Sequence, residues 1–450
     1  MNPRPAGPRM HGAPGAREEE ERMSETVNVR GRRDRGFPEI LPVREQSTLI
    51  TEMVRSRLDA VLPAAMKDAG LDMWIILCQE DDLDPVYKTM IPMDCWCPIL
   101  QMLIFVDEGN GKISRYSVSG TDTKDLYERP YAGQLEEKQW PVLLDLVAKR
   151  DPKTIGVNIG SVAWAGGGLT QNLYRQLQEK LPLKYAQRLV SAEKAAVRWG
   201  ASLTEKEIDI YRHVQEIAHC IIADSFSRMT VTPGVTTVDD LVWYYWQRAT
   251  GLGLDLAFRP YFRLIRSEAA AKALGPNDKV IRPGDAIHCD VGIKYLRLNS
   301  DNQHLAYVLR RGETDAPEGL KALMAQTNHL QNVFMKEFRL GISGNQLLQN
   351  ILTRARAEGI TTPRVYSHNL GLFLHQPGPL IGLPWEQEKA LPRGEVKLEH
   401  NYAFTMELST DGVVPEWNGQ TVRCPMEEPV VFTAEGCSTL KGRQTEYYLI

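Results

Sequence analysis

The sequence predicts an α/β fold arranged as two domains. Its 450 residues are too many for one ordinary hydrophobic core. Strands and helices alternate through the first half, whereas the second half runs from helices into a long stretch of strand and loop. With 43% hydrophobic and 24% charged residues, the composition is that of a globular protein. We expect a tail at residues 1–40, a first domain at 41–202 and a second domain at 203–450.

Composition also excludes several classes of partner. A net charge of −4 offers no electrostatic reason to expect nucleic acid or an anionic membrane. No apolar run reaches the roughly 18 residues that a membrane helix needs. The first forty residues are rich in Pro, Gly, Arg and Glu, which is typical of a disordered tail and unlike a secretory signal. Seven scattered cysteines favour free thiols in a reducing compartment, so we expect a cytoplasmic protein.

The first domain shows the alternation of an α/β unit. Residues 44–70 have the periodicity of an amphipathic helix that ends at Gly70. The short apolar run Met73–Cys78 predicts a buried strand, and Ile99–Val118 predicts a hairpin around the turn sequence EGNGK. The remaining expected elements are a helix at 138–150, a strand at Thr154–Ile159 and a helix at 169–181, and the glycine-rich run Trp164–Gly168 is expected to be a loop.

The second domain begins at a helix start signal. Thr204 and Glu207 have the spacing of a capping box, as do Ser343 and Gln346. The order of elements suits two pairs of helices laid over a curved sheet. The expected elements are a helix from Thr204, the turn Val231–Thr236, a helix through about 250, a helix at 318–338, a helix from Ser343 to near Gly359, and mostly strand from 364.

Two aspartates occupy an unusual place in this domain. The segment Ile287–Leu309 has a strand-like apolar pattern, yet it includes Asp290 and Asp301. Strands are poor in Asp, and a buried unpaired carboxylate is costly. If the two ends of the segment pair, the carboxylates come together, and a divalent ion removes their repulsion. Turn carboxylates with no ligand role explain the pair equally well at this point.

Further acidic residues and histidines follow in strand-like runs. His368 and His375 lie seven residues apart around Gly371. Glu407 sits in the middle of YAFTMELST, and Glu427 leads directly into a strand. Buried carboxylates without partners are rare. Four carboxylates and one histidine suit two divalent ions, as in two-metal hydrolysis.

The order Asp290, Asp301, His368, Glu407 and Glu427 resembles metallopeptidase family M24, which holds methionine aminopeptidase, prolidase and Xaa-Pro aminopeptidase. The approach PNDKVIRPGDAIHCDVG, the eleven-residue spacing of the aspartates and the run VVFTAEG are similar too. The resemblance implies a pita-bread catalytic domain at 203–450, preceded by a creatinase-like α/β domain. Methionine aminopeptidases usually lack such a first domain.

The resemblance also implies roles. Asp301 and Glu427 would bridge two metal ions, Asp290 would chelate one, and His368 with Glu407 would complete the other. A metal-bound hydroxide would attack the scissile carbonyl, Glu407 would carry the proton to the leaving amine, and His375 would donate to the oxyanion or hold the substrate. Oxygen-dominated ligation favours manganese, with cobalt or zinc as alternatives. Relatives with this pair of domains are often homodimers.

The sequence departs from the family pattern at a few positions. Ala273 stands seventeen residues before Asp290, where many members carry a second catalytic histidine. His288, two residues before Asp290, could substitute for it or be a structural histidine. Gln376 replaces a frequent Glu, and Arg364 stands where Xaa-Pro enzymes often carry His. Substrate specificity is therefore less determined than the chemistry.

Three functions remain open from the sequence. The first is a two-metal exopeptidase that removes the N-terminal residue from peptides with proline in second position. The second is a metal-dependent hydrolase of small amides on the same fold, of the ectoine-hydrolase or creatinase type. Creatinase-type members need no metal, so a full ligand set counts against that version. The third is a non-catalytic binding protein, and such proteins tend to lose ligands.

Overall fold

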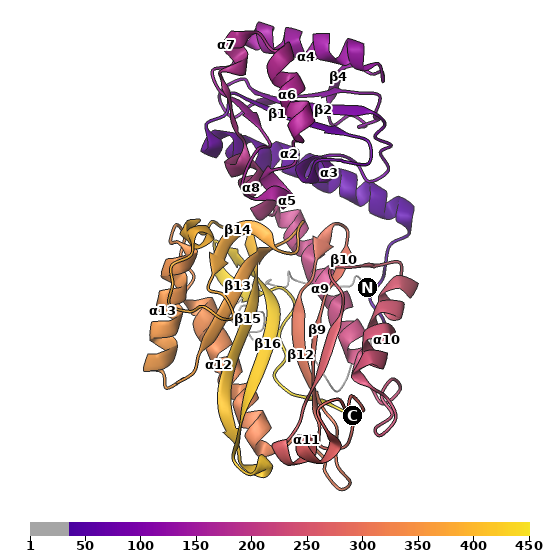
Figure 1. Ribbon diagram of the computed structural model, residues 1–450, viewed down its shortest axis with the longest axis vertical. Helices are drawn as coiled ribbons and strands as arrows, with labels where there is room; N and C mark the ends of the chain where they lie inside the picture. The colour runs from indigo at the N-terminus through magenta and orange to yellow at the C-terminus, as the bar shows by residue number, and fades with distance from the viewer. Residues whose placement is uncertain (1–35) are drawn as a thin grey trace, which may run out of the picture.

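The computed structural model describes residues 36–450, so most of the expected tail lies outside the described part. The chain then forms a mixed α/β structure with several sheets (Figure 1). The first sheet has six strands in the order β4-β3-β2-β1-β5-β6. Its strands are β1 (Met73–Gln79), β2 (Leu100–Asp107), β3 (Ile113–Val118), β4 (Glu128–Tyr131), β5 (Ile155–Val157) and β6 (Leu189–Ser191).

Helices cover both faces of this sheet because β1 is buried on both sides. Trp74, Ile76 and Cys78 pack in the cluster that includes α2. The alternate residues Met73 and Ile75 pack in the cluster that includes α4 and α6. The helices are α2 (Val43–Ala69), α3 (Pro85–Met90), α4 (Glu136–Arg150), α5 (Ala163–Gly166), α6 (Gln171–Lys180), α7 (Leu183–Ala186) and α8 (Glu193–Ala201).

A buried ion pair joins the first half of the chain to the second. Arg57 on α2 contacts Glu207 on α9 (Glu205–Ser225) at 3.0 Å, and both side chains are buried. The same guanidinium donates to the carbonyls of Trp199 and Ser202, and it lies over the Trp199 ring. The hydrophobic cluster around α2 also continues into α9 without interruption. The boundary at residue 202 stays a prediction.

The second half is built on a nine-stranded sheet whose main path runs β14-β13-β15-β16-β12-β9-β8. A small sheet of β7, β10 and β11 lies beside it. The strands are β7 (Asp255–Leu256), β8 (Tyr261–Ile265), β9 (Ala286–Val291), β10 (Ile293–Tyr295), β11 (Leu298–Asn299), β12 (Asn302–Tyr307), β13 (Arg364–Leu370), β14 (Gln376–Ile381), β15 (Tyr402–Val414), β16 (Gln420–Thr433), β17 (Gly436–Thr439) and β18 (Tyr448–Leu449).

Two pairs of helices support this sheet, as the sequence predicted. Helices α9 and α10 (Val238–Gly251) pack against β8 and β9, and α12 (Glu318–Lys336) and α13 (Gly344–Ala357) pack against β13 and β15. Figure 1 shows α12 and α13 toward one side of the strands and α9 and α10 toward the other. A short helix, α11 (Glu268–Leu274), follows β8. The arrangement is that of a curved sheet in two helix-backed halves.

Local predictions held where the sequence signal was strong. The Thr204–Glu207 capping box forms in full, and Gly70 ends α2 at φ 66°. Two expectations were wrong in part. Ser343 caps α13 as expected, but the Gln346 side chain donates to Asn350 instead of closing the box. The glycine-rich run after Trp164 was expected to be a loop, yet residues 163–166 form α5.

Candidate metal centre

One row of directly paired residues crosses the large sheet and carries three of the predicted acidic residues. Tyr366 pairs with Glu407, and Glu407 pairs with Glu427. Gln303 in turn pairs with both Glu427 and Asp290. Because directly paired residues project from the same face of a sheet, these side chains share one face. The register thus gathers carboxylates from β9, β15 and β16 that are far apart in sequence.

Asp301 and His368 lie one step from this row on the same face. Asp301 precedes Gln303 by two residues, and His368 follows Tyr366 by two. Ligand atoms of Asp301, His368 and Glu427 lie within 4.8 Å of one another. The His368 Nε2 is 3.6 Å from the Asp301 Oδ2. Asp290 and Glu407 flank this trio and interact with it electrostatically, but they lie outside the 4.8 Å group.

The orientation of His368 suits ligation through Nε2. Its Nδ1 lies 3.1 Å from the backbone carbonyl of Asn369, so Nδ1 carries the proton and donates it. That leaves the Nε2 lone pair directed toward Asp301. Burial, with the neighbouring His375, lowers the pKa of His368 to about 3, so the ring is neutral at physiological pH. A neutral imidazole is the form that binds metals.

The four carboxyl groups are in an unfavourable environment. Asp301 is 5% exposed and Glu427 is 1% exposed. Burial and the charges of the neighbouring carboxylates raise the pKa of both groups well above the ordinary value. Burial also raises the pKa of Asp290 to about 6 and that of Glu407 to about 7. The protein alone therefore does not neutralise this cluster.

The hydrogen bonds at Glu427 lead to the same conclusion. Gln303 donates from Nε2 to Glu427 Oε2 at 2.9 Å. The other oxygen, Oε1, is buried and has no hydrogen-bond partner. Unsatisfied buried carboxylate oxygens are costly, and a cation among them removes the cost. The donor set of carboxylate oxygens and one imidazole suits hard or borderline divalent ions. The residues present fit a divalent metal centre.

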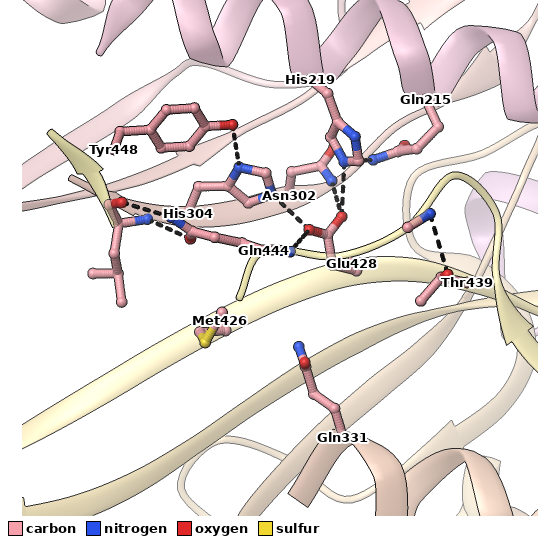
Figure 2. A network of polar contacts seen from close by, with 12 residues as sticks. Gln215, His219, Asn302, His304, Gln331, Met426, Glu428, Thr439, Gln444 and Tyr448 are labelled. Carbon is pink, nitrogen blue, oxygen red and sulfur yellow. Dashed lines mark hydrogen bonds and ion pairs between the residues drawn. The ribbon is translucent and has the colours of Figure 1, made fainter. Parts of the chain in front are cut away.

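Figure 2 shows a second cluster, centred on Glu428, whose electrostatic character is opposite to that of the first. Glu428, His219 and His304 also have metal-like spacing. However, Glu428 Oε2 accepts hydrogen bonds from His219 and from the Asn302 amide, and Oε1 accepts from His304 and from the backbone N–H of Gln444. Burial alone would raise the pKa of Glu428, but these partners outweigh it and lower the pKa to about 2. Both oxygens of the Glu428 carboxylate are thus satisfied by protein groups, and the network links α9, β12 and β16.

A chain of polar contacts that the sequence analysis did not identify supports the centre from the side. Gln303 Oε1 lies 2.9 Å from His288 Nε2, and the Arg263 Nε donates to His288 Nδ1 at 3.2 Å. His288 is therefore a buried linking residue. Gln303 and Arg263 engage both of its ring nitrogens, so neither nitrogen is free to act as a substitute catalytic group. Spacing in the sequence could have pointed to Gln303, because it lies two residues beyond Asp301 and therefore on the same face of the strand.

His375 and Ala273, the two remaining positions that the sequence analysis singled out, lie in different surroundings. The His375 ring packs edge-on against His368, with centroids 4.6 Å apart. Trp164, on α5 of the first half, donates from its indole to the His375 carbonyl at 2.8 Å. Ala273 is exposed on α11 and does not line the pocket beside Glu407. Arg263 of β8 lines that pocket instead.

Comparison with known proteins assigns the chain to a family. The model of metallopeptidase family M24 matches residues 209–434, which contain all five predicted ligands. The chain belongs to metallopeptidase family M24. Enzymes of family M24 use divalent metals, in agreement with the donor set described above. No curated protein matches the chain by sequence.

Solved structures share the M24 pita-bread fold over most of the chain. An X-Pro aminopeptidase from Thermotoga maritima is 16% identical, with a TM-score of 0.60 over 86% of this chain and 100% of that chain. A Xaa-Pro dipeptidase from Bacillus anthracis is 16% identical, with a TM-score of 0.56 over 90% of this chain and 100% of that one. A prolidase from Pyrococcus horikoshii is 16% identical, with a TM-score of 0.55 over 87% and 99%.

Two further expectations concern membrane spans and disulfides. No helix among the described residues is long and apolar enough to cross a membrane. None of the seven cysteines, all of which lie among the described residues, forms a disulfide.

Proposed function

We propose that this M24 protein is a two-metal aminopeptidase that removes the N-terminal residue from peptides with proline in second position. The observation that carries the proposal is the convergence of one imidazole and four carboxylates on one face of the sheet, with the protein leaving their charge uncompensated. A binding protein on this fold has no need to retain that costly set. Solved relatives include an X-Pro aminopeptidase and Xaa-Pro dipeptidases, which supports the proline preference.

We assign the ligands from burial and position. Asp301 and Glu427 are the most enclosed carboxylates and would contact both ions. Asp290 would bind one ion, and His368 with Glu407 would bind the other. Two divalent ions held in this way supply a polarised carbonyl and a water whose pKa is lowered. The oxygen-rich set favours manganese, with cobalt and zinc as alternatives.

Two residues would handle protons and substrate. Glu407 is only partly buried and lines an open pocket, and burial raises its pKa to about 7. That value belongs to the metal-free protein. Beside two bound cations Glu407 would be ionised, and its carboxylate would take a proton and return it to the leaving amine. His375 is exposed beside His368, where it can donate to the carbonyl oxygen of the substrate. The indole of Trp164 fixes the backbone that carries His375.

The assembly and compartment are part of the same proposal. We propose a homodimer in a reducing compartment such as the cytoplasm. The lack of a disulfide among the seven cysteines supports the reducing compartment. Sedimentation and disulfide-sensitive electrophoresis would test these two statements directly.

The decisive experiment is release of the N-terminal amino acid from matched Xaa-Pro and Xaa-Ala peptides, with Mn²⁺ and with a chelator. We expect metal-dependent release confined to the Xaa-Pro series. Asp301→Asn should abolish it, whereas Asp125→Asn, at a position that is 76% exposed, should not. If no peptide is cleaved by protein that binds two metal ions, the peptidase proposal fails and small amides become the substrates to test.

A further inference from the structure

A pocket rich in arginine lies next to the metal centre. It has a volume of about 190 Å³ and is lined by Glu407, Ser409 and three arginines, Arg263, Arg364 and Arg423. Three strands contribute in register, because Arg364 pairs with Ser409 and Ser409 pairs with Pro425. This row lies two residues along the strands from the carboxylate row, which is a separation of about 7 Å. The pocket is therefore about the length of two extended residues from the proposed reaction centre.

The positive charge of the three arginines exceeds the negative charge of the carboxylates that are free to pair with them. Asp411 is the carboxylate that pairs with Arg423, at 2.9 Å, and it also lies 3.5 Å from Arg364. Arg263 has a neutral partner, since its Nε donates to the Nδ1 of His288, and that nitrogen accepts only when it carries no proton. In the proposed function Glu407 is a metal ligand, and so is Asp290, whose charge acts on Arg263. Three cations thus share one free carboxylate.

Hydrogen-bonding capacity is also left over. The Nε of Arg364 is buried and has no hydrogen-bond partner. Burial lowers the pKa of Arg263, and the nearby charge of Arg423 contributes to the same effect. Guanidinium groups bind carboxylates through two parallel hydrogen bonds, which a pocket lined by three of them can provide.

We propose that this pocket binds a carboxylate of the substrate next to the scissile bond, so that the enzyme prefers peptides that present one there. This inference rests on the proposed aminopeptidase function and names its substrate class. Two sources have the required chemistry: the acidic side chain of the N-terminal residue, and the α-carboxylate of a dipeptide. The competing explanation is that Arg364, Asp411 and Arg423 only brace the β15–β16 hairpin.

The kinetic test separates the two sources. Glu-Pro-Ala-amide against Gln-Pro-Ala-amide tests the side chain, and Gln-Pro acid against Gln-Pro-amide tests the α-carboxylate, all with Mn²⁺. We expect kcat/KM to favour the carboxylate in one of these pairs by about tenfold to a hundredfold, the strength of a charged hydrogen bond. Arg364→Met should reduce that ratio to near one. The control Arg311→Met, at an exposed arginine outside the pocket lining, should keep it.

Stability and binding measurements complete the test. Arg423→Met repeats the test if Arg364→Met does not fold. Calorimetry with reduced-bond analogues of Glu-Pro-amide, Gln-Pro-amide and Gln-Pro acid measures recognition of either carboxylate without cleavage. Tighter binding of the preferred analogue, lost in Arg364→Met, supports the pocket even if no peptide is hydrolysed, and in that case the aminopeptidase proposal alone fails. Equal kinetics and equal binding for both members of each pair would overturn the inference and leave the hairpin brace as the explanation.

Discussion

Metal binding should release protons at a pH where ordinary carboxylates have none to give. In metal-free protein, burial raises the pKa of Asp290 from 3.8 to about 6 and that of Glu407 from 4.5 to about 7. Burial and the neighbouring carboxylates also raise the pKa of Asp301 and Glu427 well above the ordinary values. Near pH 6.5 Glu407 is therefore largely protonated, and the other three carboxyl groups hold more protons than ordinary carboxyl groups would at that pH. Divalent ions bind the ionised forms, so loading should release about one proton or more.

The magnitude follows from linkage. Each released proton makes the apparent metal-binding constant rise about tenfold per pH unit, or about 1.4 kcal/mol. Between pH 6 and 7 we therefore expect the apparent metal-binding constant to rise about tenfold or more. The stability of the metal-free protein changes with pH in the opposite direction from metal binding. The stability contributed by Asp290 is fully present below its unfolded pKa of 3.8 and is lost as pH rises through about 6.

Calorimetric titration of stripped protein with Mn²⁺, in buffers of different ionisation enthalpy, counts the protons directly. Melting curves at pH 5 and pH 7.5 should show a gap between loaded and stripped protein that widens with pH. Glu428, whose pKa is lowered to about 2 by its histidine partners despite burial, stays ionised and contributes no proton. Release of less than one proton, with binding that does not vary with pH, would refute the reasoning that the cluster is uncompensated.

Three substitutions test the surroundings of the site. Glu428→Gln should destabilise the protein by about 3 kcal/mol in urea unfolding, because two buried histidines lose their anionic partner. Arg57→Met should cost about 3 kcal/mol in the same assay, because Glu207 keeps a buried charge without its cation. Trp164→Phe removes the donor to the His375 carbonyl, so kcat/KM should fall about fivefold, the equivalent of about 1 kcal/mol.

Matched substitutions at exposed positions provide the controls. Glu318→Gln and Arg175→Met alter side chains that are 83% and 70% exposed, so each should change stability by less than about 0.5 kcal/mol. Trp243→Phe, at a tryptophan that is 65% exposed on α10, should leave kcat/KM unchanged. Equal unfolding free energies for a buried substitution and its control would contradict the assigned ion networks. An unchanged kcat/KM in the Trp164 variant would show that its indole does not position the histidine loop.

Local sequence signals predicted elements whose residues make their own contacts. The run Met73–Cys78 is apolar on both faces, so it could only be a strand covered on both sides, and it is β1. Thr204 and Glu207 satisfy each other within one turn, so their capping box formed as predicted. The Gln346 side chain instead donates a hydrogen bond to Asn350, a competing partner four residues further along the helix. The turn of α5 depends on packing against the rest of the fold and had no local signal.

The sequence alone therefore determined the family, the fold class and the set of acidic residues and histidines worth examining, because each depends on residue type and order. Only the tertiary structure decided how they meet. Strand register placed Gln303 between Asp290 and Glu427. It also put Glu428, whose carboxylate oxygens have hydrogen-bond partners, in different surroundings from Glu427, which has an oxygen without one. Ala273 lies on an exposed helix away from these residues. Adjacent residues of a strand face opposite sides of a sheet, so neighbours in sequence can have opposite electrostatic environments.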